Sequence, residues 1–102
     1  ERKNMPNVRS RSPLPTGNQD ALSISTTVVT LTVPNAATSA RIYVRTASIV
    51  FDTSTTDPSA TLGFQADVGD IINLNTRAEL DRFEAIRQGG TDATIDVRYF
   101  AD

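Results

Sequence analysis

Hydrophobic residues alternate with polar residues from residue 21 onward, with the two-residue period of strands that bury one face. The alternation comes in short segments, and each segment is followed by residues that favour turns. These segments lie at residues 22–25, 28–33, 40–45, 47–51, 61–66 and 71–74. Short strands at this spacing predict an all-β fold, a single small antiparallel β-sandwich or barrel.

The apolar side of these segments supplies the predicted core. A chain of 102 residues can bury roughly two-thirds of its unfolded surface, so a core without disulfides is feasible. The residues expected to be mostly buried in one sandwich are Val29, Leu31, Val33, Ile42, Val44, Ile49, Phe51, Leu62, Phe64, Ile72, Leu74, Phe83, Ile86, Ile95 and Val97.

Residues 76–87 fit two different periods. Thr76 and Glu79 have the spacing of a capping box, and apolar residues recur at three-residue intervals over residues 80–86, as on a helix. A helix of about twelve residues is marginal on its own, however, and residues 82–87 can equally form a strand. The pattern alone therefore leaves helix and strand open for this segment.

Our prediction combines the two. We expect one short helical turn at residues 77–81, followed by a hairpin in which residues 83–88 pair with residues 93–100. Gly89 and Gly90 lie in the intervening turn, where glycine readily adopts the positive φ angles of a tight hairpin.

Residues 1–20 have no hydrophobic period and hold three of the five prolines of the chain. Proline fixes φ and lacks the amide donor that strand pairing uses, so an extended or polyproline-like segment is expected. The sequence thus predicts an extended N-terminal arm over residues 1–20 and a β-sandwich domain over residues 21–102.

Charge is distributed unevenly between these parts. Residues 1–18 have a balance of +3, whereas residues 19–102 carry six Arg and eleven acids, a balance of −5. A few basic residues diluted by Pro, Asn and Ser are a weak footprint for nucleic acid, so we expect the arm to lie along an acidic protein surface. The residues predicted to bind this partner are Arg2, Lys3, Arg9, Arg11, Pro13 and Pro15.

Composition excludes several classes of chemistry. The chain has no His, Cys or Trp, which removes disulfides, Cys/His metal sites and nucleophilic catalysis that depends on His or Cys. Carboxylate pairs such as Asp81 with Glu84 lack an aromatic platform for a sugar, and no apolar stretch approaches the length of a membrane span. We therefore expect no enzyme, no cofactor and no membrane partner. Four acids lack calcium-loop spacing and are assigned to turns: Asp52, Asp57, Asp67 and Asp70.

Three arginines are expected on strand faces opposite the apolar residues: Arg41, Arg45 and Arg98. They could pair across strands with acids such as Asp96. They could instead form part of an interface, where Arg is enriched over Lys. Lys3 is the only lysine of the chain, which favours the interface.

Six segments follow one another in a recognisable order: VTLTVP at 29–34, ARIYV at 40–44, IVF at 49–51, DPSATLG at 57–63, FEAIR at 83–87 and TDATIDVRY at 91–99. This order resembles small β-rich structural proteins of tailed double-stranded DNA bacteriophages, whose genes tend to accompany those of the head and its connector. The resemblance covers about four-fifths of the chain and includes no catalytic motif.

The resemblance implies a non-enzymatic virion protein, assembled in the host cytoplasm. Within that class, the basic arm and acidic domain favour a capsid decoration (cement) protein that forms oligomers and clamps neighbouring major capsid subunits through its arm. The alternative is a tail, baseplate or small fibre or receptor-binding component. A carbohydrate-binding or enzymatic module is disfavoured because Trp and a plausible acid/base pair are missing.

Overall fold

The structure is a computed structural model that describes residues 14–54, 57–59 and 62–101. Within these residues the chain forms short strands and one helix of six residues. All strand pairs are antiparallel. The elements in chain order are β1 (Leu14–Ile24), β2 (Val29–Thr30), β3 (Ser39–Arg45), β4 (Ile49–Asp52), β5 (Phe64–Ala66), β6 (Ile71–Leu74), α1 (Arg77–Arg82), β7 (Glu84–Arg87) and β8 (Ala93–Ala101).

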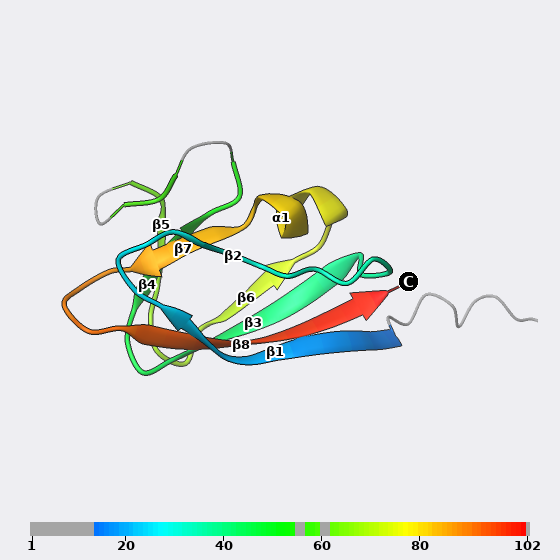
Figure 1. Cartoon of the computed structure of the whole chain (residues 1–102), viewed down its shortest axis with the longest axis horizontal. Helices are drawn as coiled ribbons and strands as arrows, with labels where there is room; N and C mark the ends of the chain where they lie inside the picture. Colours follow the sequence, from blue (N-terminus) through cyan, green and yellow to red (C-terminus); the bar gives the residue numbers. More distant parts are fainter. Residues whose placement is uncertain (1–13, 55–56, 60–61, 102) are drawn as a thin grey trace, which may run out of the picture.

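The strands form two sheets of four strands each (Figure 1). The first sheet has the order β1-β8-β3-β6, and the second has the order β2-β7-β4-β5. The two sheets and α1 enclose one hydrophobic core, so the predicted all-β sandwich with one short helix is confirmed.

The core follows the two-residue period most closely in β3 and β8. Ile42 and Val44 of β3 face Val97 and Ile95 of β8 in register, and all four side chains are fully buried. Of the predicted core residues, Ile49, Ile72, Leu74 and Phe83 are also buried, and Val29, Leu31, Val33 and Phe51 are partly buried against the same cluster.

Three predicted core residues lie outside the core: Leu62 and Phe64 are exposed, and Ile86 is half-buried. Leu62 and Phe64 are 51% and 64% exposed. Phe64 shares a face of β5 with the buried Ala66, but it lies at the start of that strand and stays largely exposed, with its ring centre 5.9 Å from that of Phe51. Ile86 lies three residues after Phe83, a spacing that suits one face of a helix and not one face of a strand. The segment is a strand in which Ala85 points into the core, so Ile86 faces the other side.

The predicted hairpin of residues 83–88 with 93–100 is wrong. β7 pairs with β2 and β4, whereas β8 lies in the other sheet between β1 and β3. The connection crosses from one sheet to the other, a separation of about 10 Å that a five-residue loop can span. Gly89 and Gly90 accordingly do not have the positive φ angles expected for a tight hairpin turn.

The predicted helical turn at residues 77–81 is confirmed as α1. The capping box is complete, since the Thr76 hydroxyl accepts from the Glu79 amide (3.2 Å) and the Glu79 carboxylate accepts from the Thr76 amide (3.1 Å). Leu80 anchors the helix in the core. At Phe83 the backbone becomes extended and continues into β7.

The predicted boundary of the arm at residue 20 is also wrong, because β1 begins at Leu14. Residues 14–20 are extended, as expected, but they pair with β8 along the edge of the first sheet. An edge strand needs hydrogen bonds on one side only, and β1 has an irregular register just after Pro15, so the missing proline amide is tolerated. Gln19 ties this segment to the domain, because its side-chain oxygen accepts from the buried Tyr99 hydroxyl and from the Thr32 amide.

Candidate protein-interaction surface

The outer face of the first sheet carries the polar half of the alternation in β3, β6 and β8. This surface combines three arginines with an exposed tyrosine and an exposed isoleucine, and arginine and aromatic residues are enriched at protein interfaces. We call it the arginine face and define it by Arg41, Tyr43, Arg45, Ile71, Asn73, Asp96, Arg98 and Phe100.

Strand register arranges these side chains in rows. Arg41 lies between Asn73 of β6 and Arg98 of β8. Tyr43 lies between Ile71 and Asp96 in the next row. Tyr43 is 38% exposed and Ile71 is 60% exposed, so an apolar contact is available directly beside the charged row.

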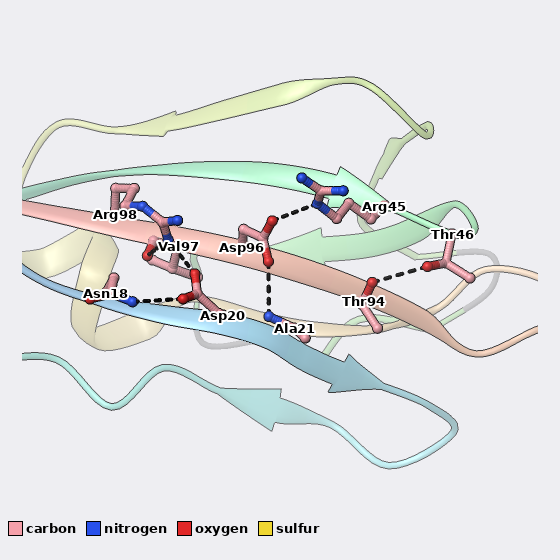
Figure 2. A network of polar contacts seen from close by, with 9 residues as sticks. All are labelled: Asn18, Asp20, Ala21, Arg45, Thr46, Thr94, Asp96, Val97 and Arg98. Carbon is pink, nitrogen blue, oxygen red and sulfur yellow. Dashed lines mark hydrogen bonds and ion pairs between the residues drawn. The ribbon is translucent and has the colours of Figure 1, made fainter.

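Asp96 is the main polar anchor within the face (Figure 2). One of its oxygens accepts from Arg45 Nε (2.5 Å), and the other accepts from the Ala21 amide (2.8 Å). Ala21 has a φ of 52° within an irregular stretch of β1, and this bend gives the Asp96 carboxylate its backbone donor. The hydrogen bond from Ala21, followed by that from Arg45, lowers the pKa of Asp96. Asp96 therefore stays ionised and links β1, β8 and β3.

Arg98 is neutralised by the edge strand. Its guanidinium pairs with Asp20 (2.6 Å), and Asp20 also accepts from the Asn18 side-chain amide (3.0 Å) (Figure 2). The expectation that strand arginines pair with acids is thus confirmed for Arg98 and for Arg45.

Arg41 differs from these two arginines. It has no carboxylate partner among the described residues, and its guanidinium carbon lies 5.3 Å from the centre of the Phe100 ring. Shallow hollows of about 210 and 250 Å³ lie on either side of it. Asn73 and Asn75 help to line the first hollow, and residues of the apolar row line the second. Both hollows include Arg41, which makes it the centre of the face.

Most of the residues predicted to bind a partner lie outside the described part of the chain, namely Arg2, Lys3, Arg9, Arg11 and Pro13. Pro15 is described, and it is exposed in β1 opposite Phe100, at the border of the arginine face. Sequence analysis missed Tyr43 and Ile71 as surface contacts. Both could have been found from the sequence, because each is an apolar or aromatic residue on the polar side of an alternating strand.

Two of the acids assigned to turns, Asp52 and Asp70, accept hydrogen bonds from nearby backbone amides, whereas the Asp67 carboxylate accepts from the Ser48 hydroxyl and the Gln65 side-chain amide. Asp52 accepts from the amides of Thr53 (2.7 Å) and Ser54 (3.0 Å). Asp70 accepts from the Asp67 amide (2.8 Å). In the described ranges no group of three or more potential ligand residues is placed to hold a metal ion.

The carboxylates that could have formed an acid/base pair, among them Asp81 and Glu84, have different surroundings in the structure. Asp81 pairs with Arg77 (3.1 Å), and Glu79 caps α1. The pKa of Glu84 is raised, first by burial and then by the neighbouring carboxylates of Asp57 and Asp52.

No helix in the described residues is long and apolar enough to cross a membrane.

Comparison with known proteins adds no assignment. No protein-family model, no curated protein and no solved structure matches the chain. The arginine face is therefore the feature from which a function can be inferred.

Proposed function

We propose that this protein is a non-enzymatic structural component of a tailed bacteriophage particle, a capsid decoration protein that binds neighbouring capsid subunits. The arginine face is the observation that carries the proposal. It is a sheet surface with exposed Tyr43 and Ile71 beside Arg41; Arg and Tyr are enriched at protein interfaces, and a partner would also remove the apolar surface of Ile71 from water. The resemblance of the chain to small β-rich virion proteins supports the proposed class of particle.

Two separate contacts would hold the protein on a shell. The arginine face would contact one capsid subunit, while the basic residues of segment 1–13 would reach an acidic surface on a neighbour. Tethering through two weak contacts raises the overall affinity because the second contact forms within the complex already made by the first. Binding that exists only in the assembled shell stabilises the shell by mass action.

The test uses phage particles made with and without the protein. We expect particles without it to assemble but to release DNA at a lower temperature, and we expect added purified protein to restore the release temperature. High salt should remove the protein before the shell breaks, because part of the contact is between charges.

Fractionation of disrupted particles distinguishes a decoration protein from the alternative, a component of the tail, baseplate or fibre. A decoration protein stays with the emptied heads. Recovery with the tails, together with normal heat stability and poor attachment of depleted particles to cells, would assign the chain to the tail, baseplate or fibre instead.

A further inference from the structure

Arg41 occupies a position that the stability of the sheet alone does not explain. It stands directly opposite Arg98 on the neighbouring strand, and like charges placed opposite one another destabilise a strand pair. Arg98 is neutralised by Asp20 and Arg45 by Asp96, yet none of the described carboxylates contacts Arg41.

The surroundings of Arg41 are suited to receive an external group. The stack on Phe100 restrains the guanidinium, which lowers the entropy that binding would cost. The hollow that Ser39 and Phe100 also line adds the amide side chains of Asn73 and Asn75, which can donate to a further oxygen. The hollow on the other side offers Tyr43 and Ile71 to an apolar neighbour of the bound group.

We propose that Arg41 binds an Asp or Glu carboxylate of the protein partner, with the apolar part of the partner's segment packed on Tyr43 and Ile71. The inference rests on the proposed function and adds the chemistry of the surface that the arginine face recognises. A carboxylate suits the site because guanidinium and carboxylate groups form two parallel hydrogen bonds in one plane. It would also neutralise Arg41, the arginine of this opposed pair that has no carboxylate partner among the described residues.

The first experiment measures co-sedimentation of the purified full chain with particles that lack it. Arg41→Gln is expected to weaken binding at least tenfold while leaving the melting temperature unchanged or higher, since the variant relieves a like-charge pair. Arg82→Gln is the matched control, because Arg82 is an exposed arginine on α1, outside the arginine face. Wild-type affinity of Arg41→Gln would overturn the inference.

The second experiment exploits the absence of lysine from residues 4–102. In Arg41→Lys, a water-soluble carbodiimide activates a nearby carboxylate, and the new amine displaces the urea leaving group to form an amide bond. Mass spectrometry should find this bond between position 41 and an Asp or Glu of a particle subunit, whereas Arg82→Lys should give none.

The outcomes separate the two proposals. If the wild-type chain does not bind depleted particles, the proposed function fails. If wild-type chain binds but Arg41→Lys forms no cross-link at position 41, the carboxylate inference fails and the function stands. Binding abolished by nuclease treatment would also overturn the inference, because the bound anion would then be a phosphate of nucleic acid.

Discussion

Three phenylalanines form a row from the surface of the sandwich into its core. The ring centres of Phe64 and Phe51 are 5.9 Å apart, and those of Phe51 and Phe83 are 5.7 Å apart. Exposure falls along the row, from 64% at Phe64 to 1% at Phe83. Phenylalanine therefore occurs at both ends of one row of rings, exposed at Phe64 and buried at Phe83.

This gradient predicts the stability of two matched variants. Phe83→Ala should lower the free energy of unfolding by about 3–5 kcal/mol, because it removes buried apolar area and leaves a cavity. Phe64→Ala should cost less than about 1 kcal/mol, because most of that ring already contacts water. Urea denaturation monitored by circular dichroism measures both. Equal losses would show that the burial gradient along the row is wrong.

Glu84 predicts a pH dependence of stability. Burial and the charges of Asp57 and Asp52 raise its pKa, so the folded protein favours the neutral acid. Stabilisation by this group is present below its unfolded pKa and is lost as the pH rises through the higher folded value. Glu84→Gln should therefore raise the melting temperature at pH 7, and the difference from wild type should vanish near pH 3. A gain of the same size at both pH values would contradict this explanation.

Asp96 should change stability with pH in the direction opposite to Glu84, because its pKa is lowered and not raised. Hydrogen bonds from Ala21 and Arg45 lower its pKa, so its stabilising effect is present at neutral pH and is lost as the pH falls through the folded pKa. Asp96→Asn should be less stable than wild type at pH 7, and the two proteins should converge in acid. A difference that grows in acid would exclude this role.

At the scale of elements, the positive φ angles of the described residues lie in the connections between strands, except for that of Ala21 within β1. Thr46 has a φ of 75° where β3 leaves the first sheet, and the Ala47 amide donates to the Arg45 carbonyl (2.8 Å) across it. Gly63 has a φ of 125° just before β5. A side chain at position 63 would come within 2.8 Å of Val50 Cγ1 and 2.9 Å of the Phe51 carbonyl oxygen.

Gly63→Ala should therefore destabilise the protein by about 1–3 kcal/mol, because the positive φ and the contact with β4 both oppose a side chain. Gly89→Ala is the matched control. Position 89 has open space around it and no positive φ, so this change should be neutral or slightly stabilising. Chemical denaturation of both variants checks the difference, and equal stability of the two would refute the packing at Gly63.

The two-residue period was sufficient to predict the faces of β3, β6 and β8, where each buried position carries an apolar side chain. It could not predict the partner of β7, since its pattern is compatible with a partner in either sheet. It also missed the first part of β1, because an edge strand rich in polar residues has no alternation to detect. For the arginine face, sequence reasoning found the arginines but not their register, which is what distinguishes Arg41.

At the scale of the whole molecule, β1 begins beside the last residues of β8. Leu14 is in register with Ala101, so the segment that precedes residue 14 joins the domain at one end of the first sheet (Figure 1). The pairing of β1 with β8 makes residues 14–24 part of the folded unit. Residues 1–13 and residues 14–20 should therefore respond differently to deletion.

Deletion of residues 1–13 should leave the melting temperature nearly unchanged and weaken binding to depleted particles, because the predicted partner contacts are removed while β1 is kept. Deletion of residues 1–20 should lower the melting temperature strongly, since it removes much of β1 and the Gln19 contact with Tyr99. Calorimetry of both variants measures the melting temperature, and co-sedimentation with depleted particles measures the binding. A large loss of stability in the shorter deletion would mean that residues 1–13 pack on their own domain.

The central place of β8 in the first sheet has a consequence for synthesis. β8 pairs with both β1 and β3, yet it is the last of these strands to leave the ribosome. At roughly 5–20 residues per second, β1 waits several seconds for its partner. An apolar strand left unpaired for that time could pair with other nascent chains. Because Asn18, Gln19 and Asp20 are polar, we expect the first part of β1 to resist such pairing until β8 is made.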